Sequence, residues 1–311
     1  MTRSPAFLTA PHYVLGEIAE EHTAISGLSA RIAELKILPT ADFWGWGNIR
    51  RTERSIESMA IETGTATLCA AGVDPASVDA LVLCSTRFPE ETESHGRLVE
   101  TIMTGIGLDG ADFVGLTLHR CANLLAAIKA AETMVAADRH RCVLVITTDR
   151  MAGEAKRMEK FALFSDGAAS CVVMSGEGRG DATFEVAGCA AAHNIRALDW
   201  SNEIDSTLSQ RVNKRLLTPL NMKLDDVSGL LHANIFRPIV MLKEMQAGFT
   251  PEQLDTANIP RVGHCFAADP LINLVDRHEA GELRENHYYM LASSVPGSRI
   301  GILLRKVADR P

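Results

Sequence analysis

The chain has 311 residues, of which 46% are hydrophobic and 23% are charged. This composition is typical of a globular protein with a large apolar core, and the length corresponds to two domains or one two-lobed unit. Asp and Glu outnumber Lys and Arg by 39 to 31, and the resulting net charge of −8 argues against nucleic acid as a partner. The sequence contains no stretch of about 18 uncharged apolar residues, so we expect no membrane-spanning helix and no membrane partner.

The seven cysteines are odd in number, lie mostly within apolar runs and form no Cys-x-x-Cys pair. This usage argues against a disulfide framework, and no spacing typical of metal ligands is present, so no metal site is expected. The N-terminal segment lacks the apolar run of a secretory signal. We therefore expect the protein to work in the reducing cytoplasm.

Strand-like and helical segments alternate in the first half of the chain. Residues 80–85 and 142–148 are apolar and rich in β-branched side chains, which predicts buried strands. The Ala- and Leu-rich segment 122–137 between them predicts a buried helix. A third strand is expected at 168–174, after a Ser-Asp-Gly turn, and the glycine-rich residues 176–180 predict a hinge.

The pattern recurs beyond the hinge, which divides the chain into an N-terminal half, 1–176, and a C-terminal half, 177–311. Residues 227–233 are similar to 78–84, and Cys265 corresponds to Cys121, at nearly the same offset. Each of these two cysteines opens a helical run that ends in a strand, the second strand lying at 288–294. An α/β fold with a duplicated β-α-β core is therefore predicted. The polar segment 199–217 is expected to form a helix or loop that covers the second half.

Cys121 is the strongest candidate for chemistry. It lies where a strand candidate gives way to a helix, in the run Leu118-His119-Arg120-Cys121-Ala122. Backbone N–H groups at a helix N-terminus stabilise a thiolate, and the same groups stabilise an oxyanion on a carbonyl that the sulfur attacks. Position alone leaves two interpretations open, a nucleophile or a buried structural cysteine.

A nucleophilic thiol needs a histidine from elsewhere in the chain. His232 follows a buried strand, where open α/β sheets place ligand sites, but a core histidine bonded to backbone fits equally well. His264 and Asp269 lie together in Gly263-His264-Cys265-Phe266-Ala267-Ala268-Asp269-Pro270. Asp269 also fits the role of a helix cap, because Pro270 occupies the favoured first helical position.

With these motifs the chain resembles the ketoacyl synthase III family, the 3-oxoacyl-ACP synthases III of the thiolase superfamily, over nearly its whole length. Cys121 matches the family's nucleophile segment, residues 164–169 match its glycine-containing turn, and His232-Ala233-Asn234 is similar to its His-Gln-Ala-Asn motif. The resemblance implies a thiolase fold, with duplicated β-α-β-α-β halves in five αβαβα layers. It also implies a homodimer that shares a continuous sheet, and it assigns catalysis to Cys121 and His232.

Two departures from the family pattern bear on the reaction. The segment from His264 to Asp269 replaces the family's Gly-Asn-Thr-Ser-Ala and is similar to a divergent acyltransferase branch of natural-product pathways, in which an Asp takes over from the Asn. That branch implies a Cys121–His232–Asp269 triad; if His264 instead occupies the Asn position, the set becomes Cys-His-His. Where many relatives have three glycines, Pro296 has no N–H, so the backbone N–H groups of Cys121 and Gly297 are the expected oxyanion donors.

The carboxylate of Asp269 would orient a neighbouring histidine and strengthen it as a base, whereas its negative charge would oppose the charge of an enolate. We therefore expect an acyltransferase of secondary-metabolite biosynthesis that moves an acyl group from an ACP or CoA thioester, through a Cys121 thioester, to a small-molecule acceptor. Decarboxylative condensation with a malonyl thioester is the alternative, and a non-catalytic partner subunit is the second.

No permanently bound cofactor is expected, because the acyl-CoA or acyl-phosphopantetheine thioester is itself the substrate. The resemblance places Trp44, Arg50 and Arg51 at the CoA nucleotide, where an indole stacks on adenine and a guanidinium pairs with phosphate. An aromatic core residue beside a solvated basic pair explains these three residues equally well.

Overall fold

The computed structural model describes residues 4–176, 182–199 and 205–308. Its strands are β1 (Ala6–Leu15), β2 (Ile18–Glu21), β3 (Asn48–Arg51), β4 (Ala80–Cys84), β5 (Asp112–Leu116), β6 (Cys142–Asp149), β7 (Gly167–Ser175), β8 (Thr183–His193), β9 (Val227–His232), β10 (Tyr288–Val295) and β11 (Ser298–Lys306). Its α-helices are α1 (Leu28–Leu35), α2 (Ala41–Trp44), α3 (Ile56–Ala71), α4 (Thr92–Ile106), α5 (Asn123–Ala136), α6 (Ser206–Leu217), α7 (Arg237–Gln246), α8 (Asn258–Val262) and α9 (Asp269–Glu279).

Nine strands are hydrogen-bonded in the order β5-β4-β6-β7-β1-β8-β11-β10-β9. Strands β4, β5 and β6 run parallel to one another, and β7 is antiparallel to both β6 and β1. A short antiparallel pairing between β1 and β8 joins the N-terminal strands to the C-terminal ones. Strands β2 and β3 form a separate two-stranded sheet.

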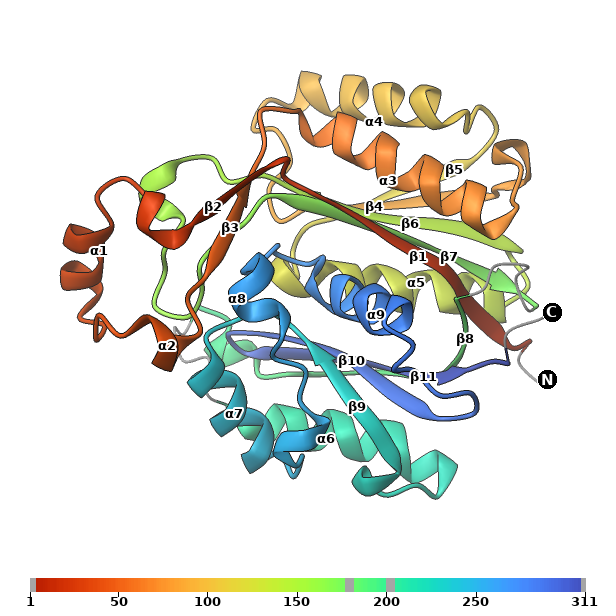
Figure 1. The fold of residues 1–311 in the computed structure, drawn as a ribbon. Helices are drawn as coiled ribbons and strands as arrows, with labels where there is room; N and C mark the ends of the chain where they lie inside the picture. The colour runs from red at the N-terminus through yellow and green to blue at the C-terminus, as the bar shows by residue number, and fades with distance from the viewer. Residues whose placement is uncertain (1–3, 177–181, 200–204, 309–311) are drawn as a thin grey trace.

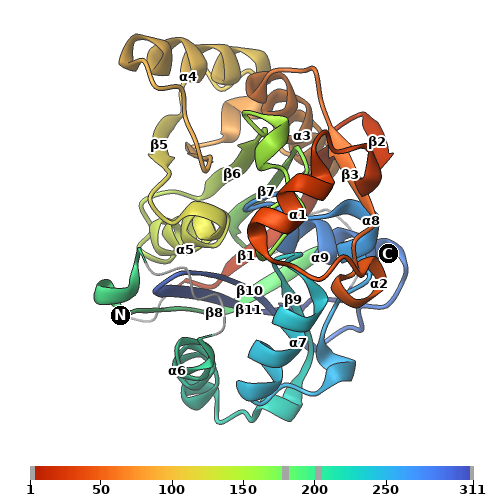
Figure 2. The ribbon, with the colours of Figure 1, turned by 90° about the vertical axis from the view of Figure 1, so that its left-hand side faces the viewer.

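The elements form five layers (Figure 1, Figure 2). Helices α3 and α4 cover the outer face of the N-terminal strands, while α6 and α7 lie outside the C-terminal strands. Helices α5 and α9 lie between the two sets of strands and contact both. This is the αβαβα arrangement of the thiolase fold, as the family resemblance implied.

Packing between the layers explains the apolar composition of β4, β6 and α5. Every residue of β4 and of β6 is buried, because helices cover both faces of this part of the sheet. In the first two turns of α5, the side chains of Leu124, Leu125, Ala127 and Ile128 are buried. The small alanines of α5 allow it to pack between the two sets of strands. This packing fixes the start of the helix, and therefore Cys121, against the C-terminal strands.

The two halves have equivalent topology, which is the pattern expected of a duplicated core. Strand β10 is parallel to β9 and antiparallel to β11, as β6 is parallel to β4 and antiparallel to β7. Helices α5 and α9 precede β6 and β10, respectively. In the C-terminal half an isolated parallel bridge between Leu230 and Leu254 lies beside β9, where β5 lies beside β4. The predicted hinge falls largely on 177–181, outside the described residues.

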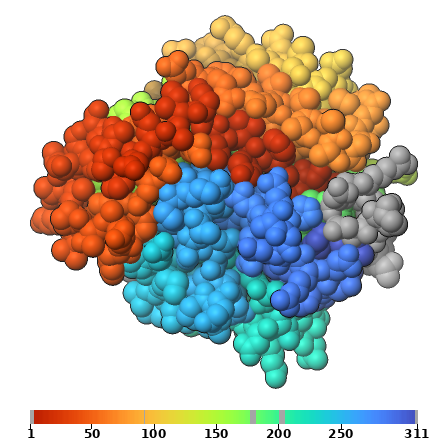
Figure 3. Space-filling model, in the orientation of Figure 1, coloured from red at the N-terminus to blue at the C-terminus, as the bar shows by residue number. Residues whose placement is uncertain are grey.

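The outer segments complete the fold. Within the predicted segment 199–217, helix α6 packs on β8 and β11 and so covers the second half as expected. The N-terminal arm that carries α1 and α2 contacts α7, and Figure 3 shows these segments, far apart in sequence, on one face of the molecule. Among the described residues, no helix has the length and apolar composition needed to cross a bilayer.

Candidate active site

A strained turn presents Cys121 at the start of α5. Arg120 has a φ of +52°, in the left-handed region that non-glycine residues rarely occupy, and it begins a single 3-10 turn over Arg120–Ala122. The side chain of Asn123 holds this turn, because its Oδ1 accepts from the His119 N–H at 2.9 Å and its Nδ2 donates to the Ser85 carbonyl at 3.0 Å. The Cys121 carbonyl accepts from the Ser293 hydroxyl on β10 at 2.9 Å. Both halves of the fold therefore fix the nucleophile segment.

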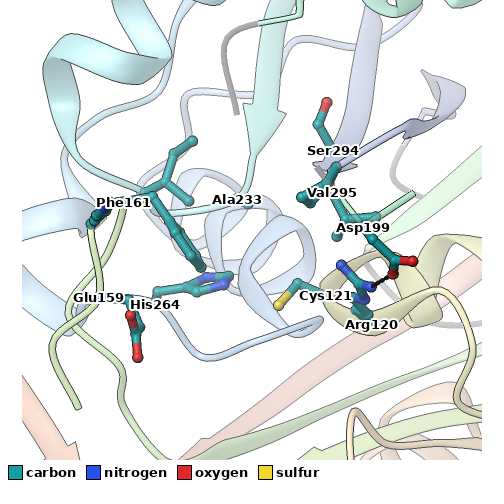
Figure 4. A pocket seen from close by; sticks show the side chains of 12 residues that line it. Arg120, Cys121, Glu159, Phe161, Asp199, Ala233, His264, Ser294 and Val295 are labelled. Carbon is teal, nitrogen blue, oxygen red and sulfur yellow. Dashed lines mark ion pairs between the residues drawn. The ribbon is translucent and has the colours of Figure 1, made fainter. Parts of the chain in front are cut away.

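Cys121 is partly exposed and lines a cavity of about 400 Å³. The wall is completed by Arg120 and by residues from five other segments: Glu159, Lys160, Phe161, Asp199, Ala233, Ile235, His264, Ser294, Val295 and Pro296. Figure 4 shows the Cys121 sulfur facing the His264 ring, with the Arg120–Asp199 ion pair, 3.7 Å long, on the other side of the sulfur. The cavity therefore combines a thiol, one imidazole and charged groups of both signs.

His264 is placed by backbone pairing between the two halves. Its N–H donates to the Leu163 carbonyl at 2.8 Å, and its carbonyl accepts from the Ser165 N–H at 2.9 Å. Gly263 precedes it with a φ of +74°, and a Cβ there would lie 2.8 Å from the Leu163 carbonyl oxygen, so a side chain does not fit. The imidazole packs against the Phe164 ring at 4.9 Å, and only 1% of His264 is exposed.

Asp269 is the hydrogen-bond partner of His264. Its Oδ2 accepts from Nδ1 of His264, and both side chains are buried. The same carboxylate also accepts from two backbone N–H groups, that of Cys265 at 2.7 Å and that of Asn234 at 2.6 Å. Asp269 is the first residue of α9, where the helix N-terminus favours a negative charge. Nε2 of His264 has no hydrogen-bond partner among the described residues and is therefore available to the cavity.

The electrostatics favour the charged form of His264. Burial by itself lowers the pKa of this imidazole, but its interactions with the Asp269 carboxylate and the Cys121 sulfur outweigh burial and raise the pKa to about 10. At neutral pH His264 is therefore an imidazolium that faces the Cys121 sulfur. Such a group holds a thiolate and carries a proton that it can give to a leaving group.

The structure corrects the expected partner of Asp269. It pairs Asp269 with His264, and no hydrogen bond joins Asp269 to His232 among the described residues. His232 is not among the residues that line the cavity, and its Nδ1 lies 2.7 Å from the Ala233 carbonyl oxygen. Its pKa is lowered, chiefly by burial, so it is neutral. The physical reason is the loop before α9, which turns His264 and Asp269, five residues apart, toward each other.

The sequence analysis did not single out Asn273, which supports the carboxylate. This buried residue lies on α9 one turn after Asp269, and its Nδ2 donates to the His232 carbonyl at 2.8 Å and to Asn234 Oδ1 at 3.1 Å. Its Oδ1 accepts from Asn258 at 2.9 Å. These bonds fix the end of β9 against α9 and so position the Asn234 N–H that binds Asp269. The signal in the sequence was an Asn within an otherwise apolar helical turn.

The residues expected at a CoA nucleotide do not line this cavity. Trp44 donates from Nε1 to the Leu38 carbonyl at 2.8 Å and packs beside the Phe236 ring. Arg51 is engaged by Glu20 and Glu154. The backbone of Arg50 bonds to Ser165 and Asp166. Trp44, Arg50 and Arg51 are all partly buried, so Trp44 is not a core residue and the two arginines are not a solvated pair.

The expected oxyanion donors differ in their placement. Cys121 lines the cavity. Gly297 does not, although the cavity is lined by the two preceding residues, Val295 and Pro296. Gly297 has a φ of +69° in the β10–β11 turn, and a Cβ there would lie 2.7 Å from the backbone of Ala197 and Leu198. The glycine is therefore required by the close approach of another loop.

Comparisons with known proteins relate the segment that carries Cys121 to a known enzyme family. Residues 117–191, which include Cys121, match the family model for 3-oxoacyl-[acyl-carrier-protein] synthase III. The chain is 22% identical to the beta-ketoacyl-[acyl-carrier-protein] synthase III of Solibacter usitatus over 288 residues, which cover 83% of this chain and 86% of that protein.

Solved structures of the same architecture cover almost the whole chain. ChlB3, titled an acyltransferase, superposes with a TM-score of 0.84 at 15% identity, covering 98% of each chain. A single-residue variant of OleA from Xanthomonas campestris gives a TM-score of 0.80 at 14% identity, covering 98% of this chain and 99% of that one. The synthase III of Aquifex aeolicus gives 0.78 at 16% identity, covering 96% and 99%. The segment that carries Cys121 is therefore similar to the 3-oxoacyl-[acyl-carrier-protein] synthases III, and nearly the whole chain has the fold of these solved structures.

Proposed function

We propose that the protein is an acyltransferase that carries an acyl group on Cys121 and passes it to an oxygen or nitrogen atom of a small-molecule acceptor. The observation that carries this proposal is the hydrogen bond from His264 to Asp269 beside the thiol. The arrangement is that of a nucleophile, a base and a carboxylate that orients the base.

The first half-reaction loads the enzyme from an acyl thioester of CoA or an acyl carrier protein. The Cys121 sulfur attacks the thioester carbonyl, a new carbon–sulfur bond forms, and the bond to the donor sulfur breaks. The imidazolium of His264 gives its proton to the departing thiolate, which leaves a neutral imidazole. The Cys121 N–H, at the start of the α5 segment, is the proposed donor to the oxyanion.

The second half-reaction discharges the acyl group. Neutral His264 takes the proton of the acceptor hydroxyl or amine while that atom attacks the acyl carbonyl, and the bond to Cys121 then breaks. Asp269 stabilises the imidazolium that forms, and the thiolate–imidazolium pair of the resting site is restored. Atoms and protons balance without a metal or a bound cofactor, so we propose that the enzyme needs no permanently bound group.

The cavity favours this reaction over decarboxylative condensation. Condensation would build up the negative charge of an enolate, and the Asp269 carboxylate behind His264 opposes a second negative charge in the cavity. The places after β9 in the cavity wall are taken by Ala233 and Ile235, whose side chains offer no hydrogen bond to an enolate. Glu159 and Lys160 in the same wall fit a polar acceptor better than a second acyl chain.

The fate of a malonyl group separates the two reactions. We would incubate the protein with malonyl-CoA, follow intact-protein mass and carbon dioxide release, and then add a panel of alcohols and amines. The proposal predicts a malonyl adduct on the wild type but not on Cys121→Ala, retention of its carboxylate, and discharge as an ester or amide. Carbon dioxide release with a new carbon–carbon bond would establish condensation instead.

We also propose a homodimer formed through β5. This strand ends the nine-stranded order, and no described strand pairs with its outer edge. Phe113 on β5 is 59% exposed and Leu118 just after it is 91% exposed. An unpaired edge with exposed apolar side chains is a surface for pairing. Light scattering after size exclusion is expected to give twice the chain mass, and Phe113→Asp is expected to give monomers; a monomeric wild type would contradict the proposal.

A further inference from the structure

A second cavity, of about 470 Å³, lies next to the catalytic one. It shares four residues with the catalytic cavity: Arg120, Asp199, Val295 and Pro296. The other residues of its wall are Leu118, His119, His193, Ile195, Leu198 and Ser298. The Arg120–Asp199 ion pair and the Val295-Pro296 segment therefore form the boundary between the two spaces (Figure 4).

Two histidines give the second cavity its polar character. His119 lies two residues before Cys121, and His193 ends β8; their ring centroids are 5.9 Å apart with a tilt of 34°. Nδ1 of His193 lies 2.8 Å from the hydroxyl of Ser298, a buried residue at the start of β11. Burial is the main cause that lowers the pKa of His119. A neutral imidazole both donates and accepts, so His119 can bind a polar neutral group beside the ring of His193.

The position of His264, the proposed base, determines which cavity the acceptor must enter and which is left for the acyl chain. His264 and Cys121 both line the first cavity, so the incoming thioester and the acceptor must each reach the sulfur there. An acyl chain that stayed in that space would block the acceptor. The second cavity, reached across Arg120 next to Cys121, is the adjacent space that can take the chain.

We propose that the second cavity holds the acyl chain on Cys121 and that His119 and His193 select a chain with an oxygen substituent, such as a hydroxyl group, a few carbons from the thioester. This inference rests on the proposed acyl transfer and adds the class of acyl group. With Ser298 at Nδ1, Nε2 of His193 is the ring nitrogen left for such an oxygen. A plain alkyl chain would instead strip water from two imidazoles without replacing their hydrogen bonds, which is unfavourable.

The test compares two CoA thioesters of equal chain length, butyryl-CoA and 3-hydroxybutyryl-CoA, in competition for Cys121. Intact-protein mass separates the two adducts. One or two new hydrogen bonds correspond to a preference of roughly tenfold for the hydroxylated chain in the wild type. His193→Leu and His119→Leu are expected to reduce that preference to near one, while His193→Asn retains part of it.

A matched control is available in His287, an exposed histidine whose Nδ1 lies 2.8 Å from the Ser228 hydroxyl. His287→Leu removes the same kind of histidine–serine pair away from both cavities and is expected to leave the preference unchanged. Equal loading of both thioesters by the wild type, or a preference that survives both leucine variants at the cavity, would overturn this inference alone. No adduct from either thioester would overturn the proposed acyl transfer and this inference with it.

Discussion

The carboxylate of Asp269 binds Nδ1 of His264, and the opposite nitrogen of that imidazole is left without a described partner in the cavity that contains Cys121. The bond fixes the ring and stabilises its charged form. Because two backbone N–H groups also bind the carboxylate, it remains in place when the imidazole gives up its proton. This hydrogen bond is the basis for assigning His264, rather than His232, as the histidine that acts on the Cys121 thiol.

Asp269→Asn tests this orientation. The amide keeps the shape of the carboxylate but removes the charge that supports the imidazolium, and its NH₂ group opposes the backbone donors of Cys265 and Asn234. By analogy with the corresponding change in serine proteases, we expect the rate of acyl transfer to fall by about 10²–10⁴-fold. Single-turnover loading of Cys121 measures the loss, and a decrease of less than threefold would show that the carboxylate does not serve the reaction.

The raised pKa of His264 predicts how stability depends on pH. The pKa rises from 6.5 to about 10 on folding, so the folded state binds the proton more tightly than the unfolded state. The resulting stabilisation is fully present below pH 6.5 and is lost as the pH rises toward 10. The difference in melting temperature between the wild type and His264→Gln should therefore shrink from pH 6 to pH 10. A difference that grows with pH would have the wrong sign.

A buried ion pair supports the C-terminal half below the site. Arg299 donates two hydrogen bonds to Glu244, at 2.6 and 3.0 Å, and both side chains are 1% exposed. Glu244→Gln leaves the buried Arg299 guanidinium without this carboxylate, which is expected to cost about 3–5 kcal/mol in unfolding free energy. Denaturant unfolding measures this loss.

The more exposed pair of Glu185 and Arg305 is the control for that substitution. Glu185→Gln should cost about 0–1 kcal/mol, because solvent screens such pairs. Equal losses for the two glutamine variants would show that burial does not amplify the Glu244 interaction.

Asn273→Leu tests the support behind Asp269. The substitution keeps the volume but removes the donor to the His232 carbonyl and one acceptor of the Asn258 amide, which keeps its bond to Asp276, at a cost of about 1–3 kcal/mol in unfolding free energy. It also releases the Asn234 backbone that binds Asp269, so the pH profile of Cys121 loading should shift along with the stability. Lost stability with an unchanged pH profile would assign Asn273 a purely structural role.

The sequence predicted most of the architecture because its strongest signals are local. Every residue of the apolar runs that became β4 and β6 is buried, and the alanine-rich run that became α5 is buried over most of its first two turns, so these segments have a clear signal in their composition. The equivalence of β4 and β9 was also visible, as a weak repeat.

The assignment of histidines was not predictable in the same way. His232 ends β9 as the family motif implies, yet it does not line the cavity that contains Cys121, whereas the loop after Gly263 brings His264 to the sulfur. Both are His residues near the ends of buried segments, so composition cannot separate them. The second cavity could not be predicted either, because His119 and His193 lie 74 residues apart in the sequence and their rings come together only in the folded chain.

The most direct test of the account is the rate at which a single acyl-CoA loads the wild type, Cys121→Ala, His264→Gln and His232→Gln, followed by intact-protein mass. The account predicts an adduct on the wild type, none on Cys121→Ala, and loading slowed by about 10²–10⁴-fold in His264→Gln, the range for loss of a positioned acid–base group. It predicts loading within tenfold of the wild type in His232→Gln. Rapid loading of His264→Gln with loss of loading in His232→Gln would contradict it and assign the thiol to the other histidine.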